Sequence, residues 1–240
     1  MGGFFFLSID EDRLAFAQCG EQILITSSVD NPTPYVGEQI IYTVRIDNST
    51  RIEAMSNPPP FEGFWYAGSL EVVKRQESGC NGTIGVTIYE RILFPLSPGE
   101  QVIPPWELSF TNNAVYDAST VVTSTETVVN VQPLPESAPD SFNGAVGLFP
   151  IMTAEIDERT IDSGDPLSLR LSIDGAGNID QLNAPQLNLP DTWRVYPRPP
   201  ITQANVEGTR LLAGVKRFEW LIFPVDTGAL QIPAIELGYF

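Results

Sequence analysis

The sequence predicts an all-β protein made of two tandem immunoglobulin-like β-sandwich domains. The first observation behind this prediction is an internal repeat, in which motifs recur 127 or 129 residues further along the chain. The repeated positions include Gly37 with Gly164, Phe94 with Phe223, and Ile103 with Ile232. The second observation is an alternation of apolar and polar residues with a period of two, which is typical of strands with one buried face. A repeat of this length corresponds to a whole domain.

The strands of the first domain follow from its apolar residues. One strand is predicted where Ile40, Tyr42, Val44 and Ile46 alternate with polar neighbours. Two more are predicted around Ile84–Ile88 and Trp106–Phe110, where the same alternation recurs. The segment Val121–Val131 is rich in valine and threonine, which favour a strand over a helix. A long helix is not expected, because no stretch combines a 3.6-residue period with capping residues.

The second domain repeats this plan. Its first clear strand is predicted where Leu167, Leu169, Leu171 and Ile173 alternate with polar residues, and a later one at Ile235–Leu237. Pro95 and Pro224 should each end a strand, because proline cannot donate to a β-ladder. Gly99 and Gly228 follow them and are predicted to take the positive φ of a tight turn.

The repeat also places the domain boundaries. Residues 1–20 form an N-terminal extension, 21–133 the first domain, 134–147 a proline-rich linker and 148–240 the second domain. Phe240 corresponds to residue 111, so the second domain lacks its last strand and should expose an edge and apolar positions. We expect that the natural chain continues. The alternative is a strand added by another subunit, for which Phe4–Ile9 is a possible donor.

Composition excludes several classes of function. The formal net charge of −17 disfavours binding to nucleic acid or directly to a membrane surface. The absence of histidine excludes serine–histidine and cysteine–histidine catalysis within the chain. Cys19 and Cys80 could form a disulfide in an oxidising compartment, although spacing alone does not decide this. No apolar run approaches the about 18 residues of a membrane-spanning helix.

Two motifs could indicate a functional site, but a structural interpretation is favoured for both. The carboxylates of Asp10–Asp12 and of Asp157, Glu158, Asp162 and Asp165 could offer oxygen ligands to calcium, but they lack the spacing and glycine of an EF-hand loop. Solvated acids at strand ends are the simpler interpretation. Gly175–Asn178 follows a strand, but the helix and third glycine of a dinucleotide-binding motif are missing, which favours a turn with positive φ at glycine and asparagine. No catalytic residue, cofactor or metal site is predicted, and the chain is not expected to be an enzyme.

Aromatic residues are the main candidates for partner binding. They form two clusters at comparable positions of the repeat, namely Phe64, Trp65 and Tyr66, and Trp193 and Tyr196. Rings beside stiff proline turns could form an exposed platform for a protein or a sugar. The alternative is that these rings fold inward and close the open end of a sandwich.

Several linked motifs resemble those of one known family. The chain resembles the first module of the BatD oxygen-tolerance family at Tyr35–Gln39, Pro95–Gly99 and Ile103–Pro105. It resembles the connector and second module of that family at Pro133–Pro135, Phe142–Gly147, Gly175–Ile179 and Gly238–Phe240. The resemblance covers roughly residues 25 to 240, and it implies a structural or contact role for Asn178 because that segment recurs in the family.

The resemblance implies an exported bacterial protein whose sandwich modules lie outside the cytoplasm, tethered by a C-terminal membrane helix. It implies partners among von Willebrand factor A domain proteins and MoxR-type ATPases, and a scaffold role in envelope stress without catalytic residues. This chain departs from the family pattern because it lacks a clear signal peptide and ends before any tether. We therefore expect a non-enzymatic, extracytoplasmic protein-interaction module. The alternatives are a subunit of an adhesive or filamentous assembly joined by strand exchange and, more weakly, a carbohydrate-binding protein.

Overall fold

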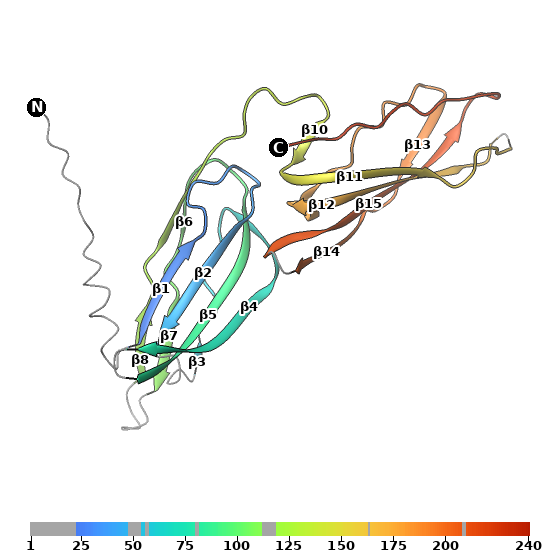
Figure 1. Cartoon of the computed structure of the whole chain (residues 1–240). Helices are drawn as coiled ribbons and strands as arrows, with labels where there is room; N and C mark the ends of the chain where they lie inside the picture. The colour runs from blue at the N-terminus through green and yellow to red at the C-terminus, as the bar shows by residue number, and fades with distance from the viewer. Residues whose placement is uncertain are drawn as a thin grey trace, which may run out of the picture.

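The computed structural model describes residues 23–47, 54–55, 58–79, 82–111, 119–162, 164–207 and 210–240. Within these residues the regular elements are strands, apart from the single 3-10 turn η2 (Ile179–Gln181). The predicted all-β class is therefore confirmed. Figure 1 shows two groups of strands, which we call the first and second modules, joined by an irregular connector.

The first module has two layers. One layer is an antiparallel sheet of β1 (Leu24–Val29), β2 (Ile40–Asp47), β5 (Gly82–Pro95) and β4 (Phe64–Gly79), in that order. The other layer contains β3 (Ala54–Met55), β7 (Glu107–Thr111) and β8 (Ser119–Thr123), together with the pair β6 (Gly99–Ile103) and β9 (Thr127–Val131). Alternate residues of β2 point between the layers and form a core with residues of β7 and β9. The largest fully buried members are Trp106, Tyr42, Ile40, Ile46 and Leu93.

The second module contains one main sheet. Its strands are β11 (Gly147–Ile156), β12 (Leu167–Gly177), β15 (Leu211–Pro224) and β13 (Trp193–Pro197), with β14 (Ile201–Glu207) also pairing with β15. A small parallel pair joins β10 (Phe142–Ala145) to β16 (Gly238–Tyr239). The segment 225–237 carries no strand and lies against the inner face of the sheet through Ile232, Ile235 and Leu237.

The internal repeat is confirmed by the register of the strands. Ile40 of β2 pairs with Leu93 of β5, and the corresponding Leu167 of β12 pairs with Ile222 of β15. Likewise Phe64 pairs with Pro95, and Trp193 pairs with Pro224. The turn glycines agree as well, because φ is +109° at Gly99 and +108° at Gly228. The main sheets of the two modules therefore share one strand-pairing plan.

Three details differ from the sequence predictions. Val121–Val131 is two strands in two sheets, because Ser124 leaves the ladder and its Oγ accepts a hydrogen bond from the Trp106 N–H (2.9 Å). Ile235–Leu237 is not a strand, since the described residues of the second module hold no counterpart of the β8 strand that pairs with β7. Gly175–Asn178 is not an isolated turn but the end of β12; Gly177 has positive φ (+134°) whereas Asn178 has φ −77°.

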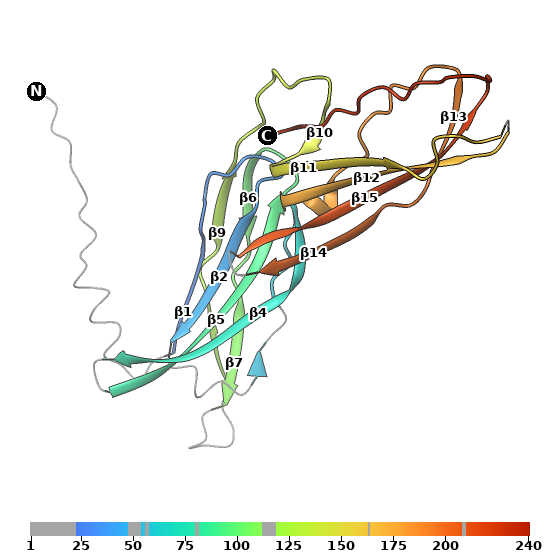
Figure 2. The ribbon, with the colours of Figure 1, turned by 45° about the vertical axis from the view of Figure 1, so that its right-hand side comes forward.

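The two modules lie at an angle to each other and touch directly. Figure 2 shows the near end of the second sheet meeting β4 and β5 of the first module. The last residues of the predicted linker belong to the second module, because Ala145 is a buried member of its core. The boundaries at residues 133 and 147 stay a prediction.

Candidate functional site

The junction between the modules is built from a second apolar face of the first sheet. Tyr89 and Leu93 of β5 point into the core of the first module. Ile92 and Phe94 point to the opposite face, because side chains alternate along a strand, and there they join the core of the second module. Ala67 and Trp65 of the neighbouring β4 lie on the same face. We call Trp65, Ala67, Ile92 and Phe94 the junction face.

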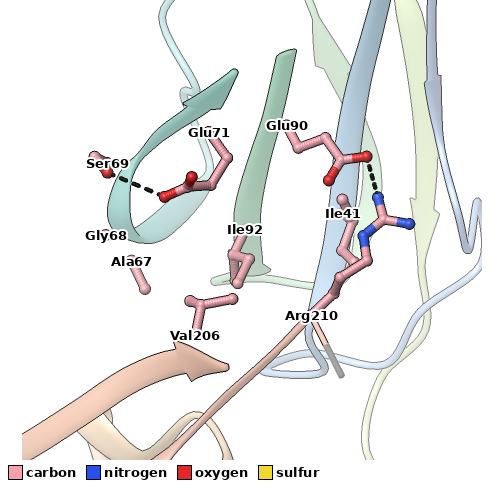
Figure 3. A pocket seen from close by; sticks show the side chains of 9 residues that line it. All are labelled: Ile41, Ala67, Gly68, Ser69, Glu71, Glu90, Ile92, Val206 and Arg210. Carbon is pink, nitrogen blue, oxygen red and sulfur yellow. Dashed lines mark hydrogen bonds and ion pairs between the residues drawn. The ribbon is translucent and has the colours of Figure 1, made fainter. Parts of the chain in front are cut away.

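Polar contacts fix the position of the β14–β15 hairpin on the first module. The Gln39 side-chain amide of the first module binds the backbone of this hairpin. Its Nε2 donates to the Arg210 carbonyl (2.9 Å), and its Oε1 accepts from the Leu212 N–H (2.7 Å). The Arg210 guanidinium pairs with the Glu90 carboxylate, as Figure 3 shows. Arg210 also has a positive φ (+61°), which is unusual for a residue with a Cβ. The hairpin tip is therefore held by both its backbone and its side chain.

The chain segment that enters the second module is held at the same junction. The Asn178 amide accepts a hydrogen bond from the Val146 N–H (2.9 Å) and donates one to the Gly144 carbonyl (2.8 Å). Val146 and Asn178 in turn press against Gly37, where a Cβ would lie 3.1 Å from Val146 Cγ2. The rings of Tyr35 and Phe240 meet edge to face with centroids 4.8 Å apart. Both modules are thus joined by packing at several points in addition to the covalent connector.

A narrow cleft of about 80 Å³ lies beside these contacts. Its walls are Ile41 and Ile92 of the first sheet and Val206 of β14, and Figure 3 shows Val206 facing Ile92 and Ala67. The cleft exists because β4 shifts its register between Ala67 and Glu71 and bends away from β5. The walls of the cleft are apolar, and the ion pair of Arg210 with Glu90 lies at its edge. Such a surface is suited to packing one module on the other. We therefore interpret this region as a contact site.

The structure separates the sequence-predicted aromatic residues into buried and exposed sets. Phe64 is buried in the first core, and Trp65 is part of the junction face, 5.2 Å from the Phe94 ring. Trp193 packs against the second core. Tyr66 and Tyr196 remain exposed, at 48% and 55%, on separate modules. The Arg91 guanidinium lies over the Tyr66 ring, 4.2 Å from its centroid.

Asn178, the remaining candidate, is 4% exposed, and the hydrogen bonds described above occupy both ends of its amide. Its contacts in this structure are internal ones at the junction. A buried amide with both ends paired positions the entry segment because any rotation would leave a polar group unsatisfied.

The carboxylates considered as calcium ligands do not gather in the part of the chain that the structure describes, where no three potential metal-binding side chains come together. Asp157 instead ends β11, and its Oδ1 accepts hydrogen bonds from the N–H groups of Ser168 (2.8 Å) and Glu158 (2.9 Å). Asp10–Asp12, Phe4–Ile9, Cys19 and Cys80 lie outside the described residues. Over the described ranges, no helix is long and apolar enough to cross a membrane.

Sequence reasoning missed the residues that hold the junction. Gln39 and Arg210 carry no motif, and Glu90 is one acid among 30 Asp and Glu residues. A signal for the junction face was present in Ile92–Phe94, where three consecutive apolar residues break the alternation expected of a strand with one buried face. Such a run indicates burial on both sides.

These features define a class of protein: an all-β tandem-module protein whose two modules are docked through an apolar face. The sequence model described as "BatD DUF11 like domain" matches residues 27–131 and 154–239. The chain therefore belongs to the BatD family. A comparison with curated proteins found no match.

Proposed function

We propose that this chain is a non-enzymatic scaffold, built from two immunoglobulin-like modules, that binds other proteins outside the cytoplasm. The observation that carries the proposal is the direct docking of the two modules through the junction face. Because the angle between the modules is fixed before binding, a partner can contact exposed edges of both modules. No further conformational entropy is then lost in ordering the modules relative to each other. The role in envelope stress and oxygen tolerance is inferred from the family.

The partners that we propose are von Willebrand factor A domain proteins or components of the MoxR system. The supporting argument is family membership together with exposed apolar residues on strand edges. On β11 these include Leu148 and Ile151, and on the first module Tyr66. Aromatic and aliphatic residues at exposed positions are those that contribute most at protein interfaces.

Site-specific photocrosslinking in the native bacterium tests this proposal. A photoreactive residue is placed at Ile151 or Tyr66, with Glu126, an exposed residue between β8 and β9, as the matched control. We expect crosslinks from the first two positions to a von Willebrand factor A domain protein or a MoxR-type ATPase, identified by mass spectrometry. Crosslinks equally frequent from Glu126, or to neither class of protein, would contradict the proposal.

A second candidate function is a subunit of an assembly joined by strand exchange, and one observation favours it. In the first module β1 is covered by β9, with Thr127 Oγ1 donating to Ser27 Oγ (2.9 Å), and Ile25 is 7% exposed. The corresponding residue of β11, Met152, is 36% exposed. An uncovered strand of this kind could accept a strand from another chain. Sedimentation velocity over a wide concentration range distinguishes the two functions, because only strand exchange gives growing polymers.

A further inference from the structure

The repeat gives the second module its own copy of the junction face. By strand register, Trp65 and Ala67 of β4 correspond to Arg194 and Tyr196 of β13. In the same way, Ile92 and Phe94 of β5 correspond to Leu221 and Phe223 of β15. Even the close-packed Gly37 has a counterpart, Gly164, with a similar positive φ (+77° and +93°).

These corresponding residues line an open hollow on the second module, which we call the Tyr196 hollow. Its lining is Gly164, Arg194, Tyr196, Leu221, Phe223 and Val225, with Pro224 beside them. Tyr196 meets Phe223 edge to face with ring centroids 5.5 Å apart. Tyr196 and Val225 are more than half exposed. An aromatic and aliphatic surface of this kind marks a place where another molecule binds.

The junction in the first module shows which kind of structure binds to a face of this kind. Its junction face is covered by the second module, through Val146 at Gly37, Val206 at Ile92 and Ala67, and Arg210 at Glu90. Glu219 stands in β15 where Glu90 stands in β5, but its carboxylate is already paired with Arg170 within the second module (3.6 Å). The apolar part of the docking surface thus recurs on the second module, whereas its charged group is Arg194.

We propose that the Tyr196 hollow is a docking site for a further β-module of another protein. That module presents a β-hairpin whose tip carries a small aliphatic residue, at the place that Val206 takes in the junction, and an acidic residue that pairs with Arg194. This inference rests on the proposed function, because it requires that the chain binds other proteins. It adds the chemistry of one partner.

A second copy of this chain does not fit this description. The corresponding hairpin of the first module, β4–β5, carries Ser78 and Thr83 at the positions of Val206 and Leu212. It therefore offers hydroxyl groups where the junction uses aliphatic side chains. The β14–β15 hairpin of a second copy carries Arg210, which Arg194 would repel, and it is already held on the first module of its own chain.

The difference between the two faces adds a further requirement. Arg194 replaces Trp65, so the hollow carries a positive charge where the junction face carries an indole. Tyr196 replaces Ala67 and narrows the space near the hairpin tip. The partner hairpin consequently needs an acidic residue for Arg194 and a smaller residue opposite Tyr196, which gives the two faces different specificities.

The experiment uses the full chain and a synthetic peptide of residues 201–217 that carries Val206→Ala and Arg210→Glu. The peptide is closed by a disulfide and checked by NMR to form the hairpin. Titration into the isotope-labelled chain should produce saturable shifts at Gly164, Tyr196 and Phe223. Phe223→Ala should weaken binding about tenfold or more, because it removes the central ring. Arg194→Gln, or a peptide that keeps Arg210, should weaken it about two- to fivefold, as expected for an exposed ion pair.

Three outcomes would overturn the proposal: a folded hairpin that produces no saturable shifts at the hollow, shifts confined to Ile92 and Ala67, or sedimentation that shows the chain pairing with itself through Tyr196. None of these depends on the crosslinking experiment. The hairpin can bind while crosslinks to von Willebrand factor A domain proteins fail, or the reverse, so the two proposals fail separately.

Discussion

At the scale of single residues, one aspartate closes the same bend in both modules. The Oδ1 atom of Asp30 accepts hydrogen bonds from the N–H groups of Ile41 (2.7 Å) and Asn31 (3.0 Å). The corresponding Asp157 accepts from Ser168 and Glu158 at closely similar distances. Each carboxylate thereby ties the end of one edge strand to the start of the next strand. By accepting from two backbone donors at the end of a strand, the aspartate side chain satisfies N–H groups in the way that a capping side chain does at a helix end.

We expect that Asp30→Ala and Asp157→Ala each lower the free energy of unfolding by about 1 kcal/mol, because each leaves two backbone donors without their partner. Chemical denaturation measures the loss. Glu136→Ala in the irregular connector is the control and should change little. If only one of the two aspartate variants loses stability, the equivalence of the two bends is wrong.

The contribution of Asp157 should also depend on pH. Burial raises the pKa of this carboxyl, but the N–H groups of Ser168 and Glu158 outweigh it and hold the pKa below the ordinary 3.8. The stabilisation is therefore fully present above the pKa of the unfolded chain and is lost as the pH falls through the lower folded pKa. Asp157→Asn should be less sensitive to acid than the parent chain in denaturation at pH 2 to 5. Equal acid sensitivity of the two proteins would argue against this account.

At the scale of elements, β5 and β15 share a sequence pattern and a register but differ in what covers them. Phe94 is fully buried, whereas its counterpart Phe223 is only half-buried at the hollow. We expect Phe94→Ala to cost about 3 to 5 kcal/mol of unfolding free energy, as core phenylalanine truncations do. Phe223→Ala should cost markedly less in the free chain. Thermal denaturation of the two variants decides this, and equal losses would mean that the hollow is covered.

At the scale of the whole molecule, the junction fixes how the modules are oriented. Ala67→Arg places a long charged side chain where Ala67 packs in the apolar junction face, so the modules should separate or rotate. Small-angle X-ray scattering should then give a larger radius of gyration. Tyr196→Arg, at the corresponding position of the second module, is the matched control and should leave the scattering unchanged. A junction that is merely a flexible tether would give the same curve for all three proteins.

Much of this fold could be predicted from sequence because it depends on local patterns. Alternation in Ile40–Ile46 and Leu167–Ile173 located central strands, and Gly99 and Gly228 located the corners, since positive φ favours glycine. The long hairpins were less visible. The outer part of β4 is mostly exposed and carries charged residues such as Lys74 and Arg75, so it lacks the apolar pattern by which a buried strand is recognised. Strand pairing there is decided by the partner β5.

The candidate sites divide in the same way. The aromatic clusters were found from sequence, but their burial was not. Trp65 packs inside the junction, whereas Tyr196 lies on an open surface. Gln39 and Arg210 had no sequence signal, because their role exists only where two distant segments meet.

By itself the sequence determined that one β-module occurs twice with the same register, because hydrophobic period and turn glycines act locally. Only the tertiary structure decided which copy of the repeated face is filled. Ile92 with Phe94 in β5 and Leu221 with Phe223 in β15 are similar residues at corresponding positions. The first pair is buried because it shares one core with residues of the second module, such as Phe149 and Leu212, which are distant in the chain. The second pair stays partly exposed, because it lies beside Tyr196 in a hollow that the rest of the described chain does not fill.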